Sequence, residues 1–200
     1  IDMAREFLEG QGYEVLVFHA TGTGGKTMER LIEEGYFEGV LDLTTTEWCD
    51  ELIGGVLAAG PNRLEAAGRH KVPQVVSVGA LDMVNFGPMD TVPEKFKRRK
   101  FYKHNPTVTL MRTTTEENKK LSEIIAEKLN NTNGPTVLIL PLKGVSMIDA
   151  EGQPFFGPEE DKILFDTLRE NIDQSKVELI EMDKNINDRE FAITAAKKLV

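Results

Sequence analysis

The sequence predicts an α/β protein with Rossmann-like three-layer α/β/α architecture and a mainly parallel sheet of about five strands. Short, continuous apolar runs of the kind found in strands buried on both faces alternate with helical patterns along the chain. Gly, Pro, Asp and Thr residues at turn and cap positions separate these segments. Because each strand is followed by a helix, consecutive strands are expected to lie parallel in one sheet.

Each element has its own local signal. The expected strands are the apolar runs at residues 15–18, 40–43, 74–78, 137–140 and 177–180. The expected helices are residues 2–10, 26–34, 48–53, 61–68, 114–129, 159–171 and 188–199. Capping boxes are expected where Thr44 precedes Glu47 and where Thr114 precedes Glu117.

Composition and charge exclude several classes of function for this protein. The chain has 200 residues, which suits a single α/β domain, and no apolar run long enough to cross a membrane. Its 24 Lys and Arg against 33 Asp and Glu give a net charge of -9, which argues against a nucleic-acid binder. Cys49 is the single cysteine, so an internal disulfide is excluded and a reducing, cytoplasmic compartment is expected. The start lacks a signal-peptide pattern and an initiator Met, so we expect one domain of a longer protein.

The strongest local motif is a Gly- and Thr-rich run that follows a predicted strand and leads into a predicted helix. Its glycines let the backbone approach a ligand closely, and unpaired N–H groups at the helix start favour an anion. The expected phosphate contacts are Thr21, Gly22, Thr23, Gly24, Gly25 and Lys26. A strand-to-helix turn without a ligand is the alternative. The phosphate-loop and dinucleotide-binding patterns are both incomplete, since Ala20 and Thr27 stand where each requires a glycine.

A second polar cluster, Thr44, Thr45 and Thr46, ends the next predicted strand and opens a helix. Three hydroxyl groups at that position suit phosphate or ribose oxygens. Helix capping without a ligand is the alternative.

Parallel α/β sheets bind ligands outside the carboxyl ends of their strands, which selects residues 19–26, 44–46, 79–85 and 143–149. Further candidates for ligand contact are His19, Asp42, Asp82, Asn85, His104, Ser146 and Asp149. The three aspartates follow or end predicted strands. If they converge, they would hold Mg²⁺ or act as acid or base. The alternative is that each caps a helix or a turn. Ser146 and Cys49 are candidate nucleophiles outside any nucleophile-elbow motif, and the histidines lack metal-ligand spacing, so no metal ligands are assigned.

Residues 79–106 show no strong helix or strand pattern and are expected to form a long loop or lid. Between Glu94 and His104, six Lys and Arg residues are interleaved with aromatic residues. This basic patch is expected to steer or close over a small anion, and a solvated lid is the alternative. One short patch offers too few phosphate contacts to indicate nucleic-acid binding.

Five runs are characteristic in combination: residues 19–25, 41–47, 79–87, 104–106 with 109–113, and 140–146. Together they resemble the Tm-one-like ATP-binding family, an uncharacterised family typified by a plant tobamovirus-resistance protein. The resemblance spans almost the entire chain, and it is to the carboxyl-terminal half of proteins about twice as long. It implies Rossmann-like layers, ATP binding, self-association into a homo-oligomer, and the missing amino-terminal half as a partner.

Three functions stay open at this point. The first is binding of a nucleotide (ATP, with Mg²⁺) or another small anionic ligand through the Gly- and Thr-rich loops. The second is a non-catalytic interaction or assembly module, because no catalytic constellation is recognisable. The third is an enzyme acting on a small phosphorylated or carboxylated metabolite through Asp82, Asp149 or His104. The sequence assigns no reaction.

Overall fold

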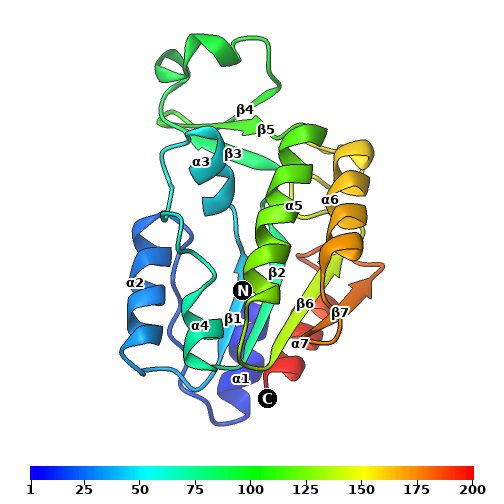
Figure 1. Ribbon diagram of the computed structural model, residues 1–200. Helices are drawn as coiled ribbons and strands as arrows, with labels where there is room; N and C mark the ends of the chain where they lie inside the picture. Colours follow the sequence, from blue (N-terminus) through cyan, green and yellow to red (C-terminus); the bar gives the residue numbers. More distant parts are fainter.

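A parallel sheet lies between two layers of helices in the computed structural model, which describes all residues, 1–200 (Figure 1). The four strands of this sheet pair in the order β1-β2-β6-β7, and every pairing is parallel. They are β1 (Val40–Thr44), β2 (Gln74–Gly79), β6 (Thr136–Pro141) and β7 (Val177–Met182). The predicted Rossmann-like three-layer class is thereby confirmed.

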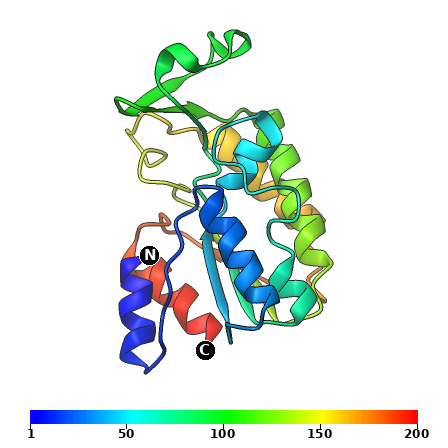
Figure 2. The same ribbon diagram turned by 90° about the vertical axis from the view of Figure 1, so that its left-hand side faces the viewer.

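Helices cover both faces of the sheet. On one face, α1 (Asp2–Gly10) packs on α7 (Arg189–Leu199), which contacts β1, β2 and β6. The other face carries α2 (Thr23–Glu33), α3 (Glu47–Ile53), α4 (Ala66–His70), α5 (Thr115–Asn130) and α6 (Pro158–Asn171) (Figures 1 and 2). Because the strand order follows the chain order, right-handed crossovers put all the connecting helices on one face.

The core forms on both faces because successive strand side chains point in opposite directions. On β6, Val137 and Ile139 pack in the cluster that contains Phe191 of α7. Leu138 and Leu140 pack in the larger cluster, which also contains residues of α5 and α6. Burial on both faces explains why the strands of this sheet are continuous apolar runs in the sequence.

A second, antiparallel sheet projects from one end of the molecule (Figure 1). Its strands pair in the order β3-β5-β4 and are β3 (Met83–Phe86), β5 (Val108–Arg112) and β4 (Phe101–Asn105). Two 3₁₀ turns, η1 (Met89–Thr91) and η2 (Glu94–Phe96), lie between β3 and β4. Residues 79–106, expected as one long loop, therefore contain two strands. Their pattern is weak because β4 is a short edge strand whose Lys103, His104 and Asn105 are exposed.

The predicted strand at residues 15–18 is wrong, so the parallel sheet has four strands in place of about five. This segment passes near β1 without pairing with it (Figure 2). Leu16 is 56% exposed and Val17 is 42% exposed, whereas an interior strand would bury both. Phe18 instead packs edge-on against Phe37, with 5.9 Å between ring centroids. An apolar run alone does not specify a backbone partner.

Two local predictions also need correction. The helix expected at residues 61–68 is α4, which begins at Ala66, because Leu64 has a left-handed φ of 73° that a helix cannot accommodate. The capping box at Thr44 is absent, since Thr44 ends β1 and Thr46 precedes α3 without a side-chain cap. The second box is confirmed: Thr114 and Glu117 bond reciprocally at the start of α5.

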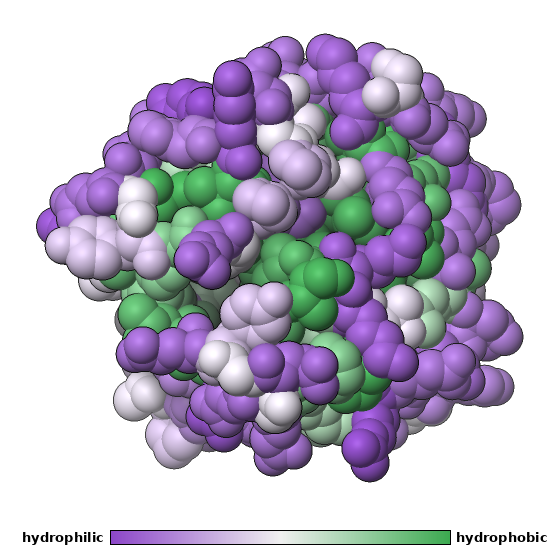
Figure 3. Space-filling model, turned by 90° about the horizontal axis from the view of Figure 1, so that it is seen from below, coloured by the Kyte–Doolittle hydropathy of each residue, from purple (hydrophilic) through white to green (hydrophobic).

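The end of the molecule opposite the antiparallel sheet shows apolar residues framed by hydrophilic side chains (Figure 3). No helix of the structure is both long and apolar enough to cross a membrane.

Candidate functional site

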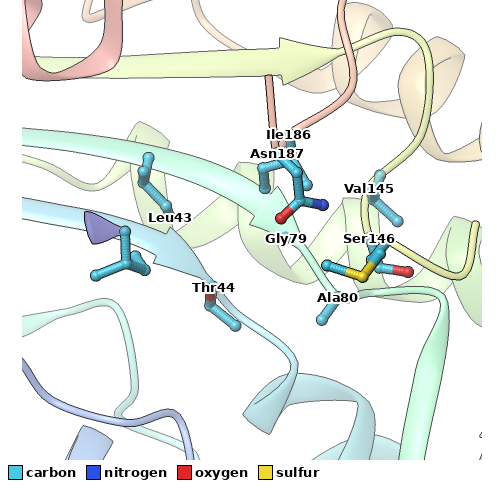
Figure 4. A pocket seen from close by; sticks show the side chains of 10 residues that line it. Leu43, Thr44, Gly79, Ala80, Val145, Ser146, Ile186 and Asn187 are labelled. Carbon is cyan, nitrogen blue, oxygen red and sulfur yellow. The ribbon is translucent and has the colours of Figure 1, made fainter. Parts of the chain in front are cut away.

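A pocket of about 160 Å³ opens at the carboxyl edge of the parallel sheet (Figure 4). Thr44 lies at the end of β1, Gly79 at the end of β2, Ser146 in the loop after β6, and Asn187 in the loop after β7. The full lining is Ile1, Leu43, Thr44, Gly79, Ala80, Val145, Ser146, Met147, Ile186 and Asn187. Three of the four loops selected from the sequence thus contribute residues to one hollow, as the position of the strand ends predicts.

The polar side chains that line this pocket are neutral. Thr44 and Asn187 supply a hydroxyl and a side-chain amide group, and no Lys or Arg lines the hollow. The Ser146 hydroxyl already donates to Asp82 and accepts two backbone amides. The backbone N–H groups of Ser146 and Met147 donate to no acceptor within the chain. Gly79 lets two strand ends approach, because a Cβ there would lie 2.2 Å from the carbonyl oxygen of Leu43. Such a hollow suits a small polar ligand that is held by hydrogen bonds.

Of the threonine cluster, only Thr44 lines the pocket. The Thr45 hydroxyl is buried and donates to the Ser77 carbonyl oxygen at 3.0 Å. The Thr46 hydroxyl donates to the Met83 carbonyl oxygen at 3.2 Å. These two side chains tie the start of α3 to β2 and β3.

At the Gly-rich loop, two of the predicted anion donors are engaged by a carboxylate of the chain itself. The amides of Gly22 and Gly25 donate to Oε1 of Glu47, at 2.6 and 3.1 Å. Glu47 belongs to α3 and is 1% exposed. The amides of Thr23 and Gly24 at the start of α2 have no acceptor within the chain.

The remaining side chains of this loop are exposed or bonded locally. Lys26 is exposed and forms no salt bridge within the chain, and Thr21 donates to the His19 carbonyl oxygen at 3.4 Å. The Thr27 hydroxyl donates to the Thr23 carbonyl oxygen at 2.8 Å. Gly24 is required for close approach, since a Cβ there would lie 1.8 Å from the His19 carbonyl oxygen.

A buried arginine that the sequence analysis missed organises this region. Arg63 donates from Nε to Glu47 at 2.7 Å and from Nη2 to Asp42 at 2.8 Å, while Nη1 bonds Asp42 and, at 3.3 Å, Glu29. Burial raises the pKa of Glu29 even though Arg63 and the amides of Leu64 and Ala66 oppose the shift. Both carboxylate oxygens of Asp42 therefore bond Arg63 inside the protein. No local sequence pattern around Arg63 indicates it, because its three partners come from distant segments.

Asp82 and Ser146 meet, as their positions after β2 and β6 predict. The Ser146 hydroxyl donates to Oδ2 of Asp82 at 2.7 Å and accepts the amides of Ile148 and Asp149, each at 3.2 Å. Oδ1 of Asp82 is buried without a partner. Burial, and then the charge of Asp149, raise the pKa of Asp82 to about 7. Both acceptor positions of the Ser146 hydroxyl are occupied, so Ser146 is a poor nucleophile in this arrangement.

A second buried arginine, also missed, binds Asp149. Nη2 of Arg112 donates to Asp149 at 3.1 Å and to Asp161 at 2.9 Å, and Nε donates to the Phe155 carbonyl oxygen at 2.8 Å. Burial, and then the charge of Asp149, raise the pKa of Asp161 to about 8. Asp82 and Asp149 therefore share one cluster, whereas Asp42 lies in the separate Arg63 network.

The other candidates lie apart from the pocket lining. Asn85 is held by Asp50, which accepts the Asn85 backbone amide at 2.7 Å and its side-chain amide at 2.8 Å. Burial raises the pKa of Asp50 to about 6 and that of the Cys49 thiol well above its ordinary value, so Cys49 is not a reactive thiolate. His104 is exposed on β4 and His19 is exposed before the Gly-rich loop. No group of three or more His, Cys, Asp or Glu residues is placed to hold a metal ion.

The C-terminal domain of the uncharacterised protein family UPF0261 matches residues 1–200. The chain belongs to this family. The predicted resemblance is confirmed at this level, because a tomato resistance protein is among the relatives.

Bacterial UPF0261 proteins and a plant resistance protein are similar to this chain. A UPF0261 protein of Clostridium tetani is 64% identical over 200 residues, which cover 100% of this chain and 50% of that protein. A UPF0261 protein of Rhizobium meliloti is 50% identical over 184 residues, 92% of this chain and 46% of that protein. The ToMV resistance protein Tm-1 of Solanum lycopersicum is 48% identical over 195 residues, 96% of this chain and 26% of that protein. The chain thus spans half or less of the length of these relatives.

Proposed function

We propose that this UPF0261 domain binds a small phosphorylated ligand, with a nucleotide such as ATP as the specific candidate, at the carboxyl edge of its parallel sheet. The observation that carries the proposal is the pocket where Thr44, Ser146 and Asn187 converge from the ends of three strands. The same strand ends supply the unengaged amides of Ser146 and Met147. Hydroxyl and amide donors in a hollow at this edge suit phosphate or ribose oxygens.

The Gly-rich loop lies at the same end of β1, because Glu47, just beyond Thr44, binds the amides of Gly22 and Gly25. The unengaged amides of Thr23 and Gly24 and the exposed Lys26 remain available to an anion there. Mg²⁺ would arrive with the phosphates of a nucleotide, since the chain offers no group of three or more ligating side chains for it.

Thermal unfolding with Mg-ATP, with ATP in EDTA, and with inorganic phosphate tests this proposal. A ligand at about 100 times its Kd should add about 2.7 kcal/mol, which raises the unfolding midpoint by roughly 5–10 °C for a chain of this size. Thr44→Val keeps the shape of the side chain but removes a pocket hydroxyl, and should reduce the shift.

Thr194→Val is the matched control, because Thr194 lies in α7 and outside the pocket lining. It should leave the shift unchanged. The proposal fails if none of the three ligands changes the unfolding midpoint at millimolar concentration. It also fails if the ligand raises the unfolding midpoints of Thr44→Val and Thr194→Val by the same amount.

A second candidate function, an assembly module, is favoured by the apolar segment before the Gly-rich loop. Tyr13 is 45% exposed, Leu16 56% and Val17 42%. Contiguous apolar patches on a protein surface often mark interaction sites. We propose that further polypeptide, either an amino-terminal half such as the longer relatives have or another copy of the chain, covers them. Light scattering would give a mass above that of the monomer if copies associate, and Leu16→Ser should lower it.

A further inference from the structure

The loop that connects β6 to α6, residues 142–157, forms one wall of the pocket and is held at its middle and near its end by Arg112 of β5. At its middle, Asp149 accepts Nη2 of Arg112 at 3.1 Å and, through Oδ2, the amide of the pocket residue Val145 at 2.9 Å. Near its end, the Phe155 carbonyl oxygen accepts Nε of Arg112 at 2.8 Å. Asp161, in the first turns of α6, accepts the same Nη2 at 2.9 Å.

The charges in this cluster do not balance without bound protons. One guanidinium faces three buried carboxyl groups, those of Asp82, Asp149 and Asp161. The Asp149 and Asp161 carboxyl groups accept the same nitrogen, Nη2 of Arg112, so they lie next to each other. A proton on one of them removes the repulsion between two adjacent carboxylates. The partnerless Oδ1 of Asp82 fits a neutral carboxyl group, because a buried charged one would require further donors.

We propose that the proton shared by Asp149 and Asp161 is a latch on residues 142–157: losing it loosens this loop, opens the pocket wall and weakens ligand binding. The weakening of ligand binding rests on the proposed function, whereas the loosening of the loop does not. With the proton bound, Arg112 is matched by one carboxylate of the pair. Without it, two adjacent carboxylates repel across a single guanidinium nitrogen.

The surrounding groups set the pH at which the latch opens. From α6, Glu160 lies near Arg112, since a Cβ at Gly157 would meet both side chains at 2.6 Å. From α5, Glu117 is neutralised by Arg99, which donates to it twice, at 2.9 and 2.6 Å. From α3, the Cys49 thiol stays neutral because burial raises its pKa. Asp82 faces the cluster from the β2–β3 turn and adds a negative charge once its own proton is lost.

The direction of the effect follows from linkage. Burial raises the pKa of Asp161 to about 8, so the closed loop binds this proton more tightly than an open, solvated loop does. Closure is therefore favoured at neutral pH and is lost as the pH rises through about 8.

Hydrogen exchange of a peptide covering residues 143–156 tests the latch without any ligand. After correction for the intrinsic pH dependence, the amides of Val145, Ile148 and Phe155 should lose about tenfold of their protection between pH 7 and pH 9. Asp161→Asn, whose neutral amide imitates the protonated carboxyl group, should keep its protection across that range. Glu159→Gln is the matched control: Glu159 is exposed in the same helix and has no ion-pair partner in the chain, so this variant should behave as the wild type does.

The latch is overturned if wild-type protection does not change with pH, or if Asp161→Asn loses protection as the wild type does. A ¹³C carboxyl titration of the wild-type protein keeps the test decisive should Asp161→Asn fail to fold, because the latch requires one carboxyl group that titrates near pH 8. The affinity for Mg-ATP over the same pH range separates the two proposals. Loop opening without any measurable ligand binding supports the latch and contradicts the proposed function.

Discussion

The carboxylate of Glu47 accepts the backbone amide of Gly22 at 2.6 Å, at the helix end where an anionic ligand was expected. Glu47 thus stabilises the partial positive charge of the α2 N-terminus from within the protein. It is held there by Arg63, at 2.7 Å. A phosphate at this loop must therefore use the donors that Glu47 leaves unengaged, or displace a buried, paired carboxylate.

Gly25→Ala should destabilise the protein by about 1–3 kcal/mol, because the added methyl group overpacks the site. Its Cβ would lie 2.2 Å from Oε2 of Glu47, and Arg63 prevents that carboxylate from moving away. Urea unfolding measures the loss. Gly10→Ala is the control, since a Cβ there meets nothing within 4 Å, and it should be neutral or slightly stabilising. Equal stability of the two variants would mean that Glu47 is not fixed against the loop.

Arg63→Met should cost about 3–5 kcal/mol at neutral pH, because it leaves buried carboxylates without their cation. Asp42, Glu47 and Glu29 all pair with this guanidinium. The deficit should shrink at acidic pH, because burial raises the pKa of Glu29 and so favours its neutral form. Denaturant unfolding at two pH values gives both quantities. Arg30→Met, which breaks only an exposed pair with Glu34, should cost about 0–1 kcal/mol, and a similar loss at Arg63 would contradict the network.

Asp82→Asn should flatten the dependence of stability on pH. Burial raises the pKa of Asp82 from 3.8 to about 7, so the folded state holds a proton that the unfolded state releases. The resulting stabilisation is full below the unfolded pKa and is lost as the pH rises through about 7. Unfolding measured from pH 5 to pH 8 should show a slope smaller by up to about 1.4 kcal/mol per pH unit in the variant. Asp90→Asn, at an exposed residue of η1, should leave the slope unchanged.

Thr114→Ala should destabilise the protein by about 1 kcal/mol, because it removes the cap of α5. The Thr114 hydroxyl accepts the Glu117 amide at 3.2 Å, and Glu117 accepts the Thr114 amide at 2.8 Å. Thermal unfolding detects the change. Thr115→Ala, one residue further on, affects only an exposed contact with Glu116 and should be close to neutral. A larger loss at Thr115 than at Thr114 would contradict the cap.

The two capping-box patterns show where sequence reasoning succeeds and where it stops. Thr114 and Glu117 form the predicted box, and Arg99, which also bonds Glu117, leaves the cap intact. Thr44 and Glu47 have the same spacing, but Thr44 stays in β1 beside Gly79 and Glu47 turns to Gly22, Gly25 and Arg63. Tertiary partners thus override a local preference when they satisfy the same groups better.

Part of the pocket lining was predicted from the sequence. The parallel arrangement predicts that the ends of β1, β2 and β6 meet, and Thr44, Gly79 and Ser146 do line one hollow. Asn187 was missed, because it follows β7 in a segment without a motif. The arginines that hold the surrounding carboxylates were missed as well, because Arg63 and Arg112 stand alone in the sequence and find their partners only in the fold.

The sequence by itself determined the α/β class, the parallel strands and most of the helices, because hydrophobic periodicity and the confirmed cap at Thr114 act over a few neighbouring residues. Only the tertiary structure decided that residues 15–18 stay unpaired and that β3, β4 and β5 form a second sheet. It also decided which carboxylate meets which arginine. Strand pairing and buried charge pairing join residues far apart in the chain, so their outcome depends on which surfaces the packed elements bring together.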